Sequence, residues 1–237
     1  MSSLNKTILI TGSSDGIGKA VALKLAKDSY NLLLLARDKS KLIEVKSLCN
    51  QSGAGSVSTY SVDLTKISEI KDFAEEIKDK SIDGLINCAG IWHKKANLED
   101  IPEDEIQQVI DTNLTGLIQL TQKIIPFLRK SEQSFIINIS SRSGHSAQEG
   151  QSVYSASKYG VRGFTEVLRE DFKGTNVRVA GIYQGGTNTQ MFNKAGEGFS
   201  EEKLSTFIPA EELANVIVFL VSRPNGIWLP EVRVENH

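Results

Sequence analysis

The sequence predicts an α/β fold, in which a parallel sheet of about seven strands is covered by helices on both faces. Short, almost continuously apolar runs alternate with amphipathic stretches along most of the 237 residues. Apolar runs of this kind are typical of strands that are buried on both faces of a parallel sheet. Right-handed crossovers through the intervening helices would place successive strands side by side in a doubly wound, single-domain layer that spans residues 1–237.

Each element is expected from its own local pattern. Large apolar side chains predict strands at 7–10, 32–36, 57–62, 85–88, 135–139 and 177–182, with a weaker alternation at 231–234. Apolar residues at helical spacing predict helices at 17–28, 39–50, 66–79, 103–130, 153–172 and 210–222. Pro126 should kink or end the fourth helix. The long irregular segment 185–207 is rich in Gly, Asn and Ser, so we expect a substrate lid near residues 186–208.

The composition excludes several classes of function. The net charge of −2, with 40% hydrophobic and 24% charged residues, provides no basic field for nucleic acid. The longest apolar run, 32–36, is too short to span a bilayer, and no basic cluster suggests a membrane surface. The two cysteines and three histidines have no metal-ligand spacing, so no metal is expected, and Cys88 should be a buried thiol of the fourth strand. The N-terminus does not resemble a signal peptide, and a cytoplasmic location is expected.

A glycine-rich turn, residues 11–18, lies directly between the first strand and the first helix. Gly12 permits a sharp turn, and Gly16 and Gly18 let the backbone approach a pyrophosphate at the helix N-terminus. A tight turn without a ligand is the alternative interpretation. A triphosphate-binding loop is disfavoured, because Ser13 and Ala20 occupy positions where that motif needs a glycine and a hydroxyl residue.

The end of the second strand indicates which dinucleotide would bind. An acid here would bind the ribose 2′-hydroxyl of NAD, but Ala36 occupies that position and Arg37 follows it. A guanidinium can bind a 2′-phosphate through two parallel hydrogen bonds, so NADP is the expected cofactor and NAD remains possible. Asp15 and Asp38 would either place negative charge near that phosphate or cap local structure.

Tyr154 and Lys158 lie one helical turn apart on one face of the fifth predicted helix. A nearby ammonium favours the phenolate and is expected to lower the tyrosine pKa from its ordinary value of ~10. Such a phenol can give a proton to a carbonyl oxygen or take one from an alcohol. Alone, the pair would more simply be two surface residues of an amphipathic helix.

Taken in order, these motifs resemble the short-chain dehydrogenase/reductase family, over nearly the whole chain. The family's further elements are present as Asp63-Leu64, Asn87 to Gly90, Asn113, and Ser141 at the family spacing before Tyr154. The resemblance implies that Tyr154 is the general acid and base, that Lys158 holds the nicotinamide ribose, that Ser141 binds the substrate oxygen, and that Asn113 kinks its helix and holds a water. It further implies a set of cofactor-binding residues: Gly12, Ser14, Asp15, Gly16, Ile17, Gly18, Arg37, Asp63, Leu64, Asn87, Ala89, Gly90, Tyr154, Lys158, Gly185, Thr187 and Thr189.

Two positions depart from the family pattern. Gln184 replaces the usual proline before Gly185, and Thr112 replaces an apolar residue before Asn113. Gln184 and His145, together with Ser141 and Tyr154, are the expected substrate contacts, and an apolar lid suggests a small, partly apolar carbonyl compound or secondary alcohol. Family members often form homodimers or homotetramers through the helices expected at 103–130 and 153–172, so an oligomer is implied by the resemblance alone.

The expected function is therefore an NADP(H)-dependent oxidoreductase that transfers a hydride between the nicotinamide and a carbonyl or alcohol. A non-catalytic sensor of the NADP redox state is the alternative, since one fold can serve both. The presence of Ser141, Tyr154 and Lys158 together favours the enzyme over the sensor, because a sensor does not need an activated phenol. An isomerase or epimerase ranks last, because the chain is short for a nucleotide-sugar domain.

Overall fold

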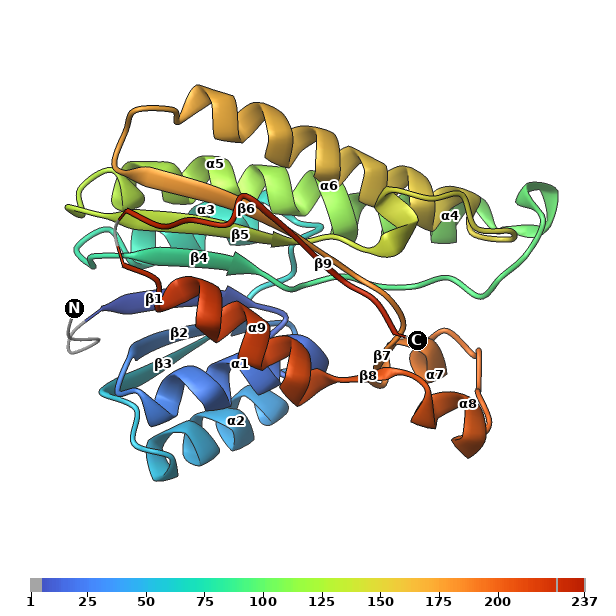
Figure 1. Cartoon of the computed structure of the whole chain (residues 1–237), viewed down its shortest axis with the longest axis horizontal. Coiled ribbons are helices and arrows are strands. Elements are labelled where there is room, and N and C mark those ends of the chain that lie inside the picture. Colours follow the sequence, from blue (N-terminus) through green and yellow to red (C-terminus); the bar gives the residue numbers. More distant parts are fainter. Residues whose placement is uncertain (1–5, 225, 237) are drawn as a thin grey trace.

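The computed structural model describes residues 6–224 and 226–236, so residues 1–5, 225 and 237 of the predicted domain lie outside the description. Within these ranges seven parallel strands form one sheet in the order β3-β2-β1-β4-β5-β6-β9 (Figure 1). The strands of this sheet are β1 Thr7–Thr11, β2 Asn31–Ala36, β3 Ser56–Ser61, β4 Gly84–Asn87, β5 Ser134–Ile139, β6 Val177–Gln184 and β9 Glu231–Val234. The predicted sheet and its seven strands are confirmed, with boundaries that differ by a few residues.

Helices cover both faces of the sheet (Figure 1). One face carries α1, α2 and α9, and the other carries α3, α5 and α6. Their bounds are α1 Gly16–Lys27, α2 Lys39–Gln51, α3 Ile67–Glu76, α5 Gly116–Leu128, α6 Ser152–Asp171 and α9 Ala210–Val221. Ile8 and Ile10 of β1 pack into the first layer and Leu9 into the second, because successive side chains of a strand point to opposite faces. Both layers are fully apolar at this strand, which explains its continuous apolar run.

The loops after β1 and β4 are held together at the carboxyl edge of the sheet. β1 pairs with β2 on one side and with β4 on the other, and Thr11 is in register with Asn87. The Thr11 hydroxyl accepts hydrogen bonds from the backbone N–H groups of Cys88 and Ala89, at 3.1 and 3.0 Å. The chain reverses direction of crossover at β1, and ligands of such sheets bind in the crevice at this point.

Two segments differ from their predicted form. The predicted helix 103–130 is interrupted: α4 Glu103–Ile110 and α5 are joined by the π-helical turn Asp111–Thr115. Pro126 lies within the last turn of α5, close to its end, as expected. The segment predicted as irregular contains β7 Thr187–Asn188, α7 Met191–Lys194, α8 Glu201–Ser205 and β8 Ile208–Pro209, and β7 pairs with β8. This lid lies beyond the carboxyl ends of the central strands (Figure 1).

Two short 3-10 turns lie at Leu98–Asp100 and Arg142–Gly144. In the part of the chain that the structure covers, no helix combines the length and apolar character needed to cross a membrane.

Candidate functional site

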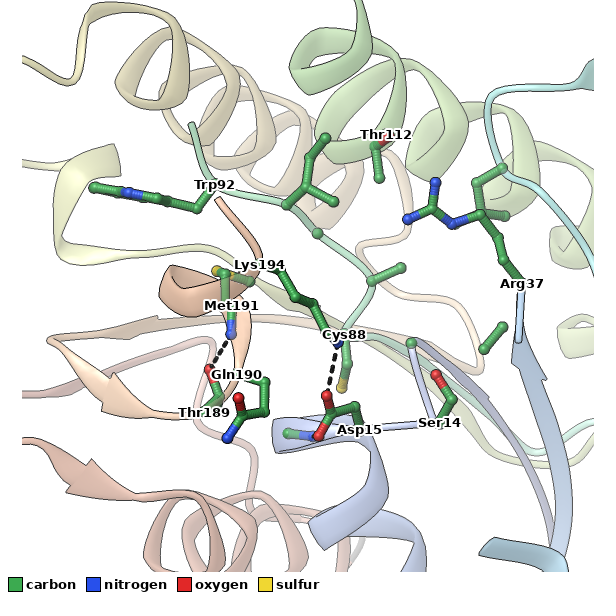
Figure 2. A pocket seen from close by; sticks show the side chains of 18 of the residues that line it. Ser14, Asp15, Arg37, Cys88, Trp92, Thr112, Thr189, Gln190, Met191 and Lys194 are labelled. Carbon is green, nitrogen blue, oxygen red and sulfur yellow. Dashed lines mark hydrogen bonds and ion pairs between the residues drawn. The ribbon is translucent and has the colours of Figure 1, made fainter. Parts of the chain in front are cut away.

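The glycine turn forms the floor of a cavity of about 350 Å³ at the carboxyl edge of the sheet (Figure 2). Gly12 and Gly16 have φ of +64° and +52°, in the left-handed region that favours glycine. A Cβ atom on Gly12 would lie 2.8 Å from the Ala89 backbone, and one on Gly18 would lie 2.4 Å from Gly12 O. All three glycines are therefore required by the path of the chain. The predicted residues that line this cavity are Gly12, Ser14, Asp15, Gly16, Ile17, Gly18, Arg37, Asp63, Leu64, Ala89, Gly90 and Thr189.

Asp15 connects the glycine turn with the lid. Its carboxylate accepts a hydrogen bond from Gly16 N–H at 2.7 Å and caps α1, while its other oxygen lies 2.7 Å from Lys194 Nζ (Figure 2). Burial alone would raise the Asp15 pKa, but the hydrogen bonds from Lys194 and Gly16 lower that pKa below its ordinary value. The charge of Asp15 is thus paired within the protein. Asp38 caps α2 by accepting from Lys41 N–H at 3.0 Å, the second of the two roles that the sequence left open.

Arg37 lies at the end of the cavity farthest from Trp92 (Figure 2). Its side chain is exposed at the end of β2, next to Asp63 in the cavity lining. Burial alone would raise the Asp63 pKa, but hydrogen bonds from Thr65 and the charge of Arg37 lower it. The cavity therefore ends in one guanidinium and one carboxylate, with the guanidinium at the position predicted to bind a 2′-phosphate.

Tyr154 and Lys158 are both buried on α6, which excludes a pair of surface residues. Their exposed fractions are 4% each, and Lys158 Nζ lies 5.7 Å from the centre of the Tyr154 ring. Lys158 Nζ donates a hydrogen bond to Ile139 O at 3.0 Å, so the ammonium is held at the end of β5. Ser141 follows that strand and its hydroxyl accepts from Ser143 N–H at 3.1 Å.

The predicted lowering of the tyrosine pKa is wrong for the protein without a ligand. Burial raises the Tyr154 pKa to about 12, and the hydrogen bond with Ser141 offsets this only in part. Burial also lowers the Lys158 pKa to about 8. Loss of solvent disfavours the charged form of either group, which raises the pKa of the phenol and lowers the pKa of the ammonium. At neutral pH the phenol is therefore protonated and the lysine is mostly charged.

Asn113 connects the loop after β4 with helix α6. It is fully buried in the π-helical turn, and its side chain pairs with both backbone groups of Ile91, at 2.7 and 2.9 Å. Its amide also donates to the Ser157 hydroxyl at 3.1 Å. The predicted distortion of the helix at Asn113 is confirmed, because Asn113 lies within the π-helical turn. Such turns are often found at functional positions.

A second cavity, of about 190 Å³, adjoins the first on the side of Tyr154 and Ser141. Gln184, at the end of β6, lines it, as do Gly185 and Thr187, which the resemblance assigned to the cofactor. Thr189 lines both cavities. Four aromatic rings form one chain of edge-to-face contacts above Tyr154, with centroid distances of 4.5 to 5.5 Å: Trp92, Phe192, Phe199 and Phe207.

Three predicted residues lie elsewhere. His145 is absent from the lining of both cavities, because its Nδ1 lies 2.8 Å from Arg162 and its ring packs on Tyr183. Asn87 is buried beneath the site and donates to Thr121 and Asn138, at 3.1 and 2.8 Å, so it supports the crevice without lining it. Cys88 follows β4 and is only partly buried, and it lines the first cavity.

Three further residues belong to the site: Trp92, which the sequence offers as a candidate for the pocket lining, and His93 and Thr112, to which it assigns no role there. Trp92 packs edge-on against the Tyr154 ring at 4.5 Å, and its Nε1 donates to Glu197 of the lid at 2.7 Å. His93 is fully buried, and its Nε2 accepts from the Tyr154 backbone N–H at 3.2 Å. Thr112 lines the first cavity, and within the described residues its buried hydroxyl has no hydrogen-bond partner. The unusual residue type at position 112 was the only signal for Thr112, and no signal in the sequence pointed to His93.

Comparisons with known proteins agree with this geometry. The profile of the family described as short chain dehydrogenase matches residues 6–199. The 3-oxoacyl-[acyl-carrier-protein] reductase FabG of Thermotoga maritima is 36% identical over 226 residues, which cover 92% of this chain and 90% of that protein.

Two solved structures are similar over most of their length. A metagenomic short-chain oxidoreductase in complex with NADP has a TM-score of 0.85 at 26% identity, covering 100% of this chain and 99% of the other. A short-chain dehydrogenase from Sphingobium yanoikuyae in complex with NADPH has the same TM-score and identity, covering 97% and 87%. The glycine turn lines the larger cavity, Ser141 and Tyr154 line the smaller one, and Asn113 and Lys158 lie beside Gly90, so the match to the family extends from motif to fold. The chain belongs to the short-chain dehydrogenase/reductase family of oxidoreductases.

Proposed function

We propose that this protein is an NADP(H)-dependent oxidoreductase that reduces a small carbonyl compound and reversibly oxidises the corresponding secondary alcohol. The proposal depends most on one observation: Tyr154 and Ser141 line a small cavity that adjoins the glycine-turn cavity. A hydride donor in the larger cavity and a carbonyl in the smaller one would then meet beside the phenol.

The lining of the larger cavity fits a dinucleotide. The α1 N-terminus and the glycine amides would bind the pyrophosphate, Arg37 the 2′-phosphate, and Asp63 and Leu64 the adenine. The buried Thr112 hydroxyl, which has no partner among the described residues, and the position of Lys158 Nζ close to Gly90 support a polar ligand here. When bound, the nicotinamide supplies the hydride or accepts it. NADP is the cofactor of the two similar structures named above.

In this proposal Tyr154 gives its proton to the carbonyl oxygen as the hydride reaches the carbon. With its pKa raised, Tyr154 carries that proton at neutral pH, as a general acid for reduction must. Ser141 would hold the same oxygen, and Lys158 would bind the nicotinamide ribose and favour the phenolate after proton transfer. Asn113 would hold the loop after β4 and helix α6 in position through its hydrogen bonds with Ile91 and Ser157. Its side chain can also hold the proposed water beside Lys158.

The assembly and location are also proposed. Tyr159 and Val167 leave apolar surface exposed on α6, with fractions of 43% and 61%. Contact between two such surfaces would give the homodimer or homotetramer that the family resemblance implies. Cys49 and Cys88 are both free thiols, as expected of a protein in the reducing cytoplasm.

A Tyr154→Phe variant tests the catalytic role. It should bind NADPH as the parent does, but its kcat should fall at least about 100-fold, as expected when a general acid is lost. NADPH oxidation should be followed at 340 nm with a panel of ketones, quinones, diketones and 3-oxoacyl thioesters. Tyr159→Phe, the same change on the exposed face of α6, is the control and should keep full activity. Equal turnover in parent and Tyr154→Phe would contradict the mechanism.

A further inference from the structure

Gln184 has an unusual place in the smaller cavity. It is the last residue of β6, only 8% of its surface is exposed, and it lines the cavity together with Tyr154 and Ser141. Among the residues that the structure covers, no group forms a hydrogen bond with its buried Oε1. A buried acceptor that no donor reaches is costly, and such groups in folded proteins are normally paired.

A second amide oxygen lies on the same wall. Asn236 lines the cavity, its Nδ2 donates to Thr206 O at 3.0 Å, and its Oδ1 is buried with no partner in the described parts of the chain. Gly185 separates the two amides, and a Cβ there would lie 2.6 Å from Asn236 Oδ1. This part of the lining therefore contains two amide oxygens that lack a donor among the described residues, one on Gln184 and one on Asn236.

The place of this wall identifies which ligand would meet it. Neither Gln184 nor Asn236 lines the larger cavity, where the glycine turn and Arg37 lie. Both line the cavity of Tyr154, where the proposed reaction places the carbonyl. Gly185 and Thr187, which are expected to bind the cofactor, also line this cavity, and of the two ligands we assign the missing donor to the substrate.

The remaining walls are of two kinds: Lys95, Arg142 and Lys203 contribute charged side chains, and four aromatic residues form an apolar cluster. Trp92, Phe192, Phe199 and Phe207 contact one another edge to face, and Trp92 extends this ring cluster to Tyr154. Aromatic edges and faces of this kind bind a flat apolar group well. The cavity of about 190 Å³ limits that group to a single ring or a short chain.

We propose that the substrate is a small carbonyl compound with a hydroxyl or N–H group near the carbonyl, which Gln184 binds, and a flat apolar group that lies on the ring cluster. This inference depends on the proposed function, because it places the carbonyl at Tyr154. Gln184 is then a specificity-determining residue, and a substrate that lacks the donor leaves its oxygen buried and unpaired.

Two matched pairs of ketones test the proposal: 2-hydroxyacetophenone against propiophenone, and 3-hydroxypropiophenone against butyrophenone. Within each pair a hydroxyl replaces a methyl group. For at least one pair the parent should prefer the hydroxyketone in kcat/KM by about 10-fold or more. Gln184→Met, which keeps the length of the side chain but cannot form the hydrogen bond, should reduce that ratio to near one. Gln51→Met, at an exposed position of α2 outside the lining of both cavities, is the control and should leave the ratio unchanged.

Each other outcome contradicts a defined part of the account. Equal rates with both members of both pairs would overturn the substrate assignment and leave the reaction intact. A Gln184→Met variant with weaker NADPH binding and an unchanged ratio would assign the amide to the cofactor. If the parent reduces none of the ketones, the proposed function is in question, and calorimetry with the NADPH-loaded protein decides this inference separately. Tighter binding of the hydroxyketone would then support it, and equal or absent binding would overturn it.

Discussion

Arg37 is the residue on which the choice of cofactor depends. It is exposed at the end of β2 and lines the larger cavity, and the neighbouring acids are occupied: Asp15 pairs with Lys194 and Asp38 caps α2. Asp63 is the acid that stays close to Arg37, and the charge of Arg37 helps to lower its pKa, so a 2′-phosphate would meet a guanidinium that has one carboxylate beside it.

An Arg37→Asp substitution should reverse the preference for NADPH over NADH. The new carboxylate repels a 2′-phosphate and can accept a hydrogen bond from a 2′-hydroxyl, so the ratio of kcat/KM values should shift by about 100-fold or more. Steady-state kinetics with both cofactors measure that ratio. Lys39→Asp makes the same change of charge outside the cavity lining and should shift it little. An unaltered ratio in Arg37→Asp would show that the phosphate binds elsewhere.

The burial of charged Lys158 should lower the free energy of unfolding at neutral pH. Its pKa falls from an ordinary 10.5 to about 8 on burial, so below pH 8 the folded protein carries a charge that solvent would hold more favourably. The difference corresponds to about 3 kcal/mol. As the pH rises from 8 to 10.5, the folded protein loses this proton before the unfolded chain does, and stability increases.

Lys158→Met should therefore raise the free energy of unfolding at pH 7 by about 2 kcal/mol, once about 1 kcal/mol for the lost bond to Ile139 O is subtracted. Urea unfolding at pH 7 and at pH 10 measures the gain, which should be largely lost at the higher pH. Lys173→Met, at an exposed lysine, should change stability little at either pH. A destabilised Lys158→Met at pH 7 would show that the buried ammonium is compensated by contacts beyond Ile139.

At the scale of elements, the contact between α5 and the loop after β3 fixes one end of the crevice. A Cβ on Gly116 would lie 2.4 Å from Leu64 O, which is rigid backbone. The first residue of α5 thereby holds Asp63 and Leu64 against the larger cavity.

Gly116→Ala should lower the free energy of unfolding by about 1–3 kcal/mol, because an added methyl in a tight site forces the backbone to shift. It should also weaken NADPH binding, because Leu64 lines the cavity. Thermal unfolding and fluorescence titration measure the two effects. Gly198→Ala, where a Cβ would meet nothing within 4 Å, is the control and should be nearly neutral. A fully stable Gly116→Ala would show that this contact can relax.

Local patterns explain why most of the fold could be predicted. The strands are continuous apolar runs, and the glycine turn, Asn113, Ser141, Tyr154 and Lys158 stand at fixed positions relative to those strands and helices. The wrong or missing predictions concern side chains whose contacts come from distant segments of the chain. Glu197 and Lys194 of the lid pair with Trp92 and Asp15, and no local spacing encodes such contacts. His145 was misplaced for the same reason, since its partner Arg162 lies on α6.

At the scale of the whole molecule, the exposed surface of α6 is where the proposed assembly can be tested. Tyr159 and Val167 lie two turns apart, with Gly163 between them, and a Cβ on Gly163 would meet nothing within 4 Å. This arrangement allows a second helix to approach closely.

Val167→Glu should convert the proposed dimer or tetramer into smaller species, because it places a charge in an apolar contact. Light scattering after size-exclusion chromatography measures the mass. Ile43→Glu, at an exposed apolar residue of α2 on the other face of the sheet, should keep the parent mass. A parent that elutes as a monomer would contradict the proposed assembly.

The two cavities share part of their walls: Ile17, Trp92, Thr189 and Met191 border both. A molecule bound in one cavity therefore changes the boundary of the other, and the two affinities are thermodynamically linked. If bound NADPH changes the affinity for the substrate by some factor, bound substrate must change the affinity for NADPH by the same factor. Measuring either one fixes the other.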